Sequence, residues 1–231
     1  MGREVPAVGC RDVAKTYWTE TSEVRALNGV SADFAQGQVS AVVGPSGSGK
    51  SSLLRIIAGL DRPTAGHVRI GAVDVTSLSA RELRRVLRNM VGYVFQSPAD
   101  NFVSYLTVLE HLELAGRRHG ATEAEALEVL AKLGIAERAD HLPGQLSGGE
   151  QQRAAFAQVL MTGASLVVAD EPTAELDDES SADLLDAVRT LAADGVTFVL
   201  ATHDAQVAEV AEQVVELEHG HLAGARGSDP A

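Results

Sequence analysis

The stretch VVGPSGSGKSSLLRIIAGL, residues 42–60, decides the fold of this chain. It joins an apolar run that ends in glycine, a loop rich in glycine, and an amphipathic run. A near-continuous apolar run is typical of a strand buried in a parallel sheet. Residues 51–60 then predict a helix that Gly59 ends. A strand, a glycine loop and a helix in this order indicate an α/β fold.

The glycine loop has the residue spacing of a phosphate-binding P-loop. Its members are Gly44, Pro45, Ser46, Gly47, Ser48, Gly49, Lys50 and Ser51, with Ser52 following. The glycines let backbone N–H groups surround the phosphates of a nucleotide. Lys50 can reach the β- and γ-phosphates, and the hydroxyl of Ser51 can bind Mg²⁺. This pattern alone leaves kinases, GTPases, helicases and transport ATPases open.

The rest of the chain predicts a parallel core with antiparallel strands before it. Buried strands are predicted at MVGYVFQ (90–96), SLVVADE (165–171) and VTFVLATHD (196–204). Before the P-loop, VPAVGCRDV (5–13) and VRALNGVSADF (24–34) predict antiparallel strands, with Asn28–Gly29 and Gln36–Gly37 as turn signals. GHVRIGAVDV (66–75) and VVELEHGHLAG (214–224) predict hairpins, and GARGSDPA (224–231) predicts a frayed tail.

A helical block interrupts this core between about residues 97 and 164. LTVLEHLELAGRRHG (106–120) and TEAEALEVLAKLG (122–134) have helical periodicity, and Thr122 with Glu125 forms a capping box. In LSGGEQQR (146–153), Ser147 and Glu150 have the same spacing, so a further helix begins there. Its two glycines leave N–H groups uncovered at the positive end of the helix, which is how an anion site is built. The chain therefore carries two phosphate-type cradles.

Composition restricts the classes of function. The chain has 231 residues, a net charge of −13 and a single cysteine, so we expect no nucleic-acid partner, no internal disulfide and a cytoplasmic location. It has no apolar run of membrane-spanning length and no secretory signal at its start. The one basic cluster is RELRRVLR (81–88), where four arginines share a helical face. It predicts either a solvated face or a contact with a partner or membrane surface.

Two adjacent carboxylates complete the chemistry that the residues themselves suggest. Asp170 and Glu171 end an apolar strand. The first can hold Mg²⁺ through water, and the second is free to polarise an attacking water molecule.

The ordered set of motifs resembles the ATP-binding-cassette family. The set consists of GPSGSGKSS (44–52), Gln96 after YVF, LSGGEQQR (146–153), VVADEPT (167–173), AELDD (174–178) and ATHD (201–204). The block IAGLDRPTAGHVRI (57–70) is similar to the subfamily of lipoprotein-release, macrolide-efflux and cell-division transporters. The resemblance implies one P-loop ATPase domain over residues 1–231. Residues 1–96 and 165–231 would hold a RecA-like core with an antiparallel β subdomain, and about 97–164 a helical signature subdomain.

The resemblance also implies roles for individual residues. Glu171 would be the general base, with His203 contacting the γ-phosphate and Gln96 joining the Mg²⁺ and water network. Asp170 would hold Mg²⁺ with Ser51 and Gln96. Tyr17 would stack on adenine, with Trp18 as a substitute.

The two cradles would then serve one ATP in a head-to-tail dimer. Ser147, Gly148 and Gly149 of one subunit would close over the γ-phosphate held by Lys50 of the other, and Asp177 would touch the opposing subunit. The second subunit could be identical or similar. A separate transmembrane permease would hold the pair peripherally on the inner face of the cell membrane.

Three alternatives to a transporter ATPase remain open from sequence. An ATP-driven actuator would act on a membrane protein without moving solute. A soluble cassette protein of DNA repair or translation usually has tandem cassettes or coiled-coil insertions. A P-loop metabolite kinase leaves LSGGEQQR and His203 unexplained.

Overall fold

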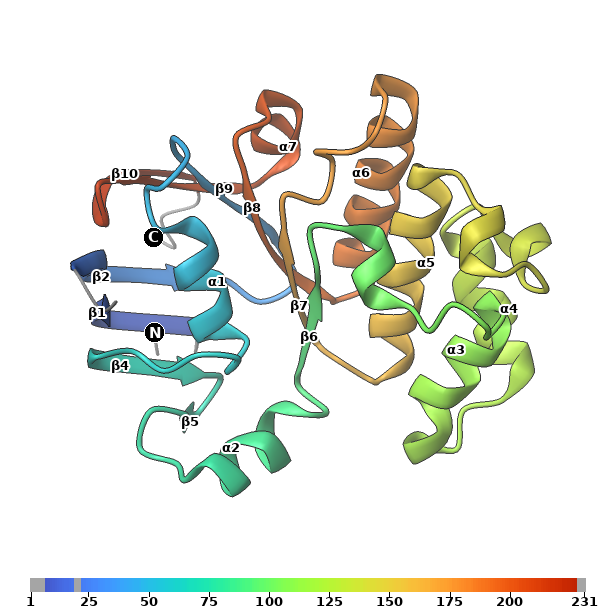
Figure 1. The fold of residues 1–231 in the computed structure, drawn as a ribbon, viewed down its shortest axis with the longest axis horizontal. Coiled ribbons are helices and arrows are strands. Elements are labelled where there is room, and N and C mark those ends of the chain that lie inside the picture. The colour runs from blue at the N-terminus through green and yellow to red at the C-terminus, as the bar shows by residue number, and fades with distance from the viewer. Residues whose placement is uncertain (1–6, 19–21, 228–231) are drawn as a thin grey trace.

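The computed structural model describes residues 7–18 and 22–227, and its strands form two sheets (Figure 1). The larger sheet has the order β10-β9-β3-β8-β7-β6, and all its neighbouring strands are parallel except the antiparallel pair β9 and β10. Its strands are β3 (Val39–Val43), β6 (Val91–Val94), β7 (Leu166–Asp170), β8 (Thr197–Thr202), β9 (Gln213–Glu218) and β10 (His221–Gly227). The predicted parallel core is confirmed.

The smaller sheet is antiparallel and has the order β2-β1-β4-β5. It consists of β1 (Val8–Trp18), β2 (Glu23–Phe34), β4 (Ala65–Ile70) and β5 (Val73–Asp74). This confirms the predicted antiparallel strands before the P-loop and the predicted hairpin after the first helix.

Helices cover both faces of the larger sheet. The helices of the described part are α1 (Lys50–Ile57), α2 (Ala80–Leu87), α3 (Val108–Gly116), α4 (Glu123–Lys132), α5 (Gly148–Met161), α6 (Asp178–Ala193) and α7 (Ala205–Val210). Figure 1 shows α1 between the two sheets and α3, α4 and α5 grouped on the opposite side. Every residue from 97 to 164 is described, and none of them is in a strand. This is the stretch in which the sequence predicts helices.

The alternation of side chains along the strands explains this layering, because successive strand residues point to opposite faces. In β7, Val167 and Ala169 pack into the apolar cluster formed with α3 to α6. Leu166 and Val168 pack into a second cluster, formed with α1 and the smaller sheet. Both faces of the strand are apolar and both are covered, as the near-continuous apolar runs predict.

The helix signals in the sequence agree with the helix ends. The capping boxes at Thr122–Glu125 and Ser147–Glu150 are both formed. Gly59 follows α1 and Gly134 follows α4, each with φ of 67°, a left-handed conformation that suits glycine.

Three kinds of local prediction are wrong. Asn28–Gly29 is not a turn but lies inside β2, where the N–H of Asn28 donates to the carbonyl of Gly220 at 2.7 Å. The strands expected to reach Gln96, Glu171 and Asp204 end at Val94, Asp170 and Thr202. The expected frayed tail is paired with β9 as far as Gly227, and residues 228–231 lie outside the described part. Gln36–Gly37 does form the expected turn.

In the described part of the chain, none of the helices combines the length and the apolar character needed to cross a bilayer.

Candidate functional site

The P-loop connects the end of β3 to the beginning of α1, and close backbone contacts fix its shape. A Cβ atom on Gly44 would lie 2.1 Å from the carbonyl oxygen of Leu217, and one on Gly49 would lie 2.4 Å from that of Ala26. Both glycines have positive φ, at 147° and 105°. Glycine is therefore required at both positions by space as well as by conformation. Gly47, at the exposed tip, has nothing within 4 Å of such an atom.

Lys50 is the first residue of α1, and its ammonium group points back into the loop. The side chain is 7% exposed, and Nζ donates to the carbonyl oxygens of Gly44 at 2.8 Å and Pro45 at 3.4 Å. Ser51 and Ser52 follow in the first turn of α1, which carries no acidic residue. The N-terminal end of a helix and a lysine together form a positive pocket that suits phosphate.

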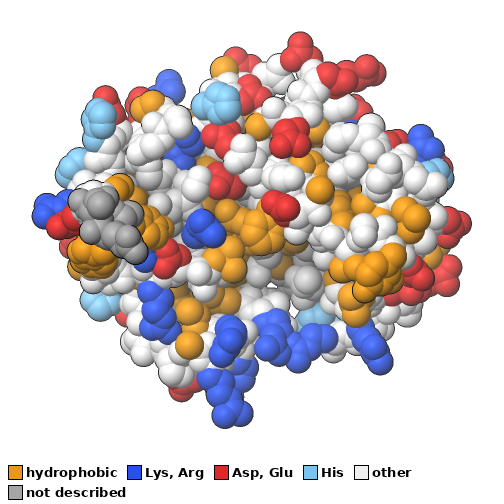
Figure 2. Space-filling model, in the orientation of Figure 1, with side chains coloured by type: hydrophobic (Ala, Val, Ile, Leu, Met, Phe, Trp, Pro, Cys, Tyr) orange, Lys and Arg blue, Asp and Glu red, His pale blue; other side chains and the backbone are white. Residues whose placement is uncertain are grey.

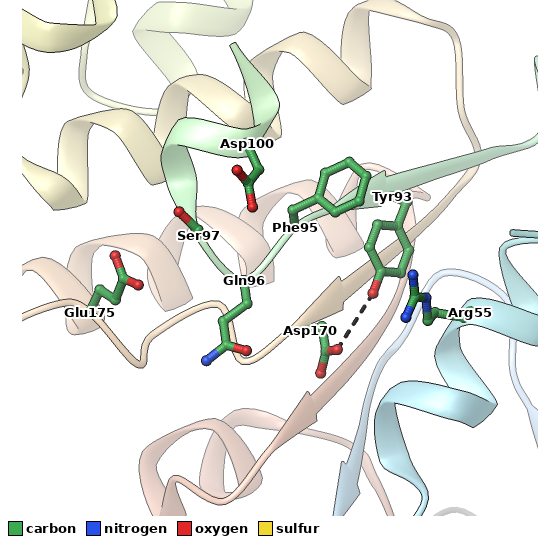
Figure 3. Close-up of a pocket in the computed structure, with 8 residues that line it drawn as sticks. All are labelled: Arg55, Tyr93, Phe95, Gln96, Ser97, Asp100, Asp170 and Glu175. Atoms are coloured by element: carbon green, nitrogen blue, oxygen red, sulfur yellow. Dashed lines mark hydrogen bonds between the residues drawn. The ribbon is translucent and has the colours of Figure 1, made fainter. Parts of the chain in front are cut away.

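Asp170 ends β7, next to this loop. Its carboxyl group is buried, its Oδ1 atom has no hydrogen-bond partner, and its Oδ2 accepts a long 3.5 Å hydrogen bond from the hydroxyl of Tyr93 (Figure 3). Burial raises the pKa of Asp170 above its usual range; the Ser51 hydroxyl opposes this shift, Glu171 adds to it, and Lys50 opposes it. An ionised carboxylate here needs a positive partner.

Glu171 connects the P-loop to the end of β8. Its Oε1 lies 3.5 Å from Nζ of Lys50, and its Oε2 lies 2.9 Å from Nδ1 of His203. The backbone N–H of His203 also donates to Oε2, at 3.2 Å. Glu171 has φ of 48°, which is uncommon outside glycine. One carboxylate thus holds two groups that can each bind phosphate.

Gln96 lines a cavity of about 280 Å³ beside this carboxylate pair. The lining residues are Arg55, Tyr93, Phe95, Gln96, Ser97, Asp100, Asp170 and Glu175. Figure 3 shows the side chains of Gln96 and Asp170 on the same side of the cavity. The structure thus brings Gln96, Asp170, Glu171, His203 and the P-loop together.

LSGGEQQR lies elsewhere. Ser147 caps α5, and Glu150 completes the box and forms an ion pair with Arg138 at 2.7 Å. A Cβ atom on Gly149 would lie 2.7 Å from Cβ of Ser180 in α6, so this glycine allows the two helices to approach closely. Ser147 and Gly148 are exposed. Figure 1 shows α5 separated from α1 by β6 and β7, so the two cradles do not face each other within one chain.

A family model described as ABC transporter matches residues 27–174. The chain belongs to the ABC transporter family. It is an ATP-binding ATPase cassette of that family, with the α/β fold described above.

Similar proteins include two macrolide export ATP-binding/permease proteins named MacB. The one from Hyphomonas neptunium is 40% identical over 230 residues, which are 98% of this chain and 35% of that protein. The one from Azoarcus sp. is 38% identical over 225 residues, which are 96% of this chain and 34% of that protein. The cassette therefore spans about a third of the length of these curated relatives.

Solved structures of a bacterial ABC transporter cassette, MJ0796, are similar to this cassette throughout. Its dimeric structure has a TM-score of 0.87 and 34% identity, and covers 95% of this chain and 98% of that one. Its dimeric post-hydrolysis state, bound to ADP and Pi, has a TM-score of 0.87 and 35% identity, with the same coverage.

The donor set of the cassette fits Mg²⁺. The hydroxyl of Ser51, the amide oxygen of Gln96 and a carboxylate oxygen of Asp170 are hard oxygen ligands, which Mg²⁺ prefers together with water and phosphate. The buried and unpartnered Oδ1 of Asp170 is consistent with this use. The described residues contain no cluster of three or more His, Cys, Asp or Glu side chains suited to a metal. A site completed by nucleotide oxygens needs no such cluster.

Tyr17 and Asp177 have partners within the cassette. The hydroxyl of Tyr17 donates to Asp61 Oδ2 at 2.9 Å, and Nζ of Lys15 lies 4.8 Å from its ring centroid. Trp18 is 68% exposed. The side chain of Asp177 caps α6 by accepting from the N–H of Ser180 at 2.8 Å, which lowers its pKa.

Sequence reasoning missed three residues of this region. Asp61 holds both Lys15, at 2.6 Å, and Tyr17. Tyr93 contacts Asp170, and Arg55 lines the cavity. Tyr93 lies in a predicted strand and Arg55 in a predicted helix, but their motifs carry no signal for these long-range contacts.

Proposed function

We propose that the cassette binds and hydrolyses ATP between two subunits arranged head to tail, and that this cycle drives a transmembrane permease. One observation carries the proposal: the side chain of Glu171 contacts those of Lys50 and His203 on one side of the molecule, whereas the exposed start of α5 lies apart from them. A phosphate that contacts both needs a second subunit.

Lys50 binds the β- and γ-phosphates of ATP in this proposal. Its ammonium group is held by two loop carbonyls and by Glu171, and all three are contacts that a phosphate can replace or share. The N–H groups of the loop surround the phosphates. The ring of Tyr17 supports adenine; its link to Asp61 orients it for this role.

Glu171 accepts the proton of the attacking water molecule. The γ-phosphate attracts Lys50 and His203 more strongly than one carboxylate does, so its binding frees Glu171 to act as a base. His203 is 70% exposed at the end of β8 and donates to the γ-phosphate.

Ser51, Gln96 and Asp170 would hold Mg²⁺. When bound, the ion would neutralise part of the negative charge of the phosphates. Asp170 keeps its place through burial in β7 and the hydroxyl of Tyr93.

Ser147, Gly148 and Gly149 of one subunit contact the γ-phosphate bound by the other. The first N–H groups of a helix lack intrahelical partners, and Ser147 and Gly148 expose this end of α5. Asp177 lies two residues beyond Glu175, which lines the cavity, and faces the opposing subunit in this proposal. The similar MJ0796 cassette was solved as a dimer, once in a post-hydrolysis state bound to ADP and Pi, and this supports a dimer here.

A permease and a location at the inner face of the membrane belong to the same proposal. The MacB relatives combine ATP-binding and permease functions, and this cassette corresponds to about a third of their length. We propose that residues 1–231 act as one ATPase domain, with about 97–164 as its signature subdomain. No solute is assigned.

Complementation tests the composite site. Ser147→Arg breaks the signature contribution to both sites of a homodimer, and Lys50→Ala breaks the P-loop contribution. Mixed in equal amounts, the two variants form heterodimers with one intact composite site. With random pairing and independent sites, about a quarter of the parent ATPase rate should return. The mixture should be measured with the membrane partner bound, because isolated subunits can associate weakly.

Each variant alone serves as the control and should be inactive. A mixture that stays as inactive as its components, while native mass spectrometry shows heterodimers, would contradict the proposal.

A further inference from the structure

The helix α2 carries an unusual concentration of positive charge in an acidic protein. Its face presents Arg81, Arg84, Arg85 and, directly after the helix, Arg88, all four exposed. Their spacing of three and four residues places them on one side of the helix. Figure 2 shows Lys and Arg side chains gathered along the lower edge of the molecule, where Figure 1 places α2. We call these four residues the arginine row.

The arginine row forms no ion pair with the carboxylates of the described residues. None of its guanidinium groups lies within 4 Å of a described carboxylate, although the chain has 32 acidic residues. Other arginines do form such ion pairs: Arg11, Arg25, Arg138 and Arg153. The acidic residue of α2, Glu82, is bound to Ser79 in the capping box. Like charges at these spacings destabilise a helix, and the electrostatic attraction between Glu82 and Arg85 offsets only part of this.

The helix that carries the arginine row is held by close packing and by a hydrogen bond before its first turn. Leu83 and Leu87 are buried on the inner side of α2. A Cβ atom on Gly59 would lie 2.1 Å from Cδ1 of Leu87, so the helix packs closely against the end of α1. Nη2 of Arg62 donates to the carbonyl of Leu78 at 2.6 Å and fixes the loop before the helix. The row is therefore presented on a fixed, positively charged edge.

We propose that the arginine row binds the anionic headgroups of the membrane next to which the cassette works. This rests on the proposed function, which brings the cassette to the membrane surface. A guanidinium group binds phosphate through two parallel hydrogen bonds. The apolar side chains of α2 face inward, so the row lacks the apolar centre typical of a protein interface. A layer of phosphate groups can bind these guanidinium groups without an apolar centre.

Vesicle binding tests this directly. The probes are vesicles of phosphatidylglycerol and vesicles of phosphatidylcholine, with co-sedimentation of the whole chain measured at low and at high salt. We expect binding to the phosphatidylglycerol vesicles alone, weakening as salt rises. The variant R81Q/R84Q/R85Q/R88Q should bind at least about 100-fold more weakly, since each basic residue near an anionic surface contributes about fivefold.

A matched control keeps the same net charge. Arg117, Arg118, Arg189 and Arg226 are exposed and lie outside the row. Their replacement by glutamine makes the same change in net charge and should reduce binding much less. Equal losses in the two variants, equal binding to both kinds of vesicle, or no binding of the parent to phosphatidylglycerol at low salt would each overturn the proposal. Binding to polyglutamate but not to vesicles would overturn it in favour of an acidic protein partner.

The two proposals can fail separately. ATP hydrolysis and ATP-dependent dimerisation of both variants, measured without vesicles, should equal those of the parent. Failed complementation with intact vesicle binding would reject the composite site alone.

Discussion

Replacing Glu171 by glutamine keeps the shape of the side chain and removes its charge. In the structure this charge lies 3.5 Å from Nζ of Lys50 and 2.9 Å from Nδ1 of His203. We expect Glu171→Gln to have two separate effects. ATP hydrolysis should fall by a factor of about 10²–10⁴, the usual contribution of a general base. The protein should also be less stable without ATP, because Lys50 loses its anionic partner.

The size of the stability effect follows from the geometry. Two unit charges 3.5 Å apart attract each other by about 5 kcal/mol at an effective dielectric constant of about 20. The desolvation of a lysine that is 7% exposed offsets part of this, and the carbonyls of Gly44 and Pro45 remain as partners. We expect a net loss of about 2 kcal/mol in the free energy of unfolding, or roughly 4–8 °C in Tm for a chain of this size.

Saturating ATP should offset the loss of stability in Glu171→Gln. The phosphates supply the negative charge that the variant lacks, so Glu171→Gln should gain more from saturating ATP than the parent does, and should accumulate as a dimer. Calorimetry with and without ATP and Mg²⁺ measures the first effect, and size-exclusion chromatography with light scattering measures the second.

The control is Glu209→Gln, an exposed residue of α7 without an ion pair among the described residues. It should change neither the rate of ATP hydrolysis nor the free energy of unfolding. The reasoning is refuted if Glu171→Gln hydrolyses ATP at the parent rate, or if ATP raises the Tm of both proteins equally.

Two further predictions concern the cradles themselves. Gly44→Ala should lower the free energy of unfolding by more than about 2 kcal/mol, because its Cβ atom would meet a backbone carbonyl at 2.1 Å. Gly47→Ala has open space around its Cβ atom and should lower it by only about 1 kcal/mol. Urea unfolding measures both losses, and equal losses would contradict the argument. The pKa of Glu150 is lowered by the N–H of Ser147 and by Arg138. Its ionised form therefore stabilises the folded protein above about pH 4.3, the pKa of an unfolded glutamate, and this stabilisation is lost as the pH falls through the lower folded pKa. Glu150→Gln should therefore be less stable than the parent at pH 7 by urea unfolding, and this difference should shrink on acidification; a difference independent of pH would refute this.

The sequence predicts the core strands well because each is buried on both faces. Val167 and Val168 face opposite clusters, and the resulting apolar runs are visible without knowledge of the fold. The turn predicted at Asn28–Gly29 fails because that dipeptide lies inside β2, where the backbone of Gly220 binds the N–H of Asn28. Such a tertiary contact overrides a local signal.

The residues of the site also fall into those that the sequence reveals and those that it does not. The P-loop and the pair Asp170–Glu171 are local in sequence and can be recognised from it. The partners Tyr93 and Asp61 cannot, because an isolated tyrosine in a strand or aspartate after a helix has many equally common uses. Their contacts arise only when β6, β7, α1 and β1 are assembled.

The backbone of Glu171 connects the core strands to the site. Its N–H donates to the carbonyl of Ala201 at 2.8 Å, which ties the end of β7 to β8, and the chain then turns with φ of 48°. This conformation costs a residue other than glycine about 1 kcal/mol or more. Glycine would remove the strain and would also remove the carboxylate that holds Lys50 and His203. The strained backbone at this position is therefore explained by the side chain, which holds Lys50 and His203. This supports the role proposed for Glu171 independently of its motif.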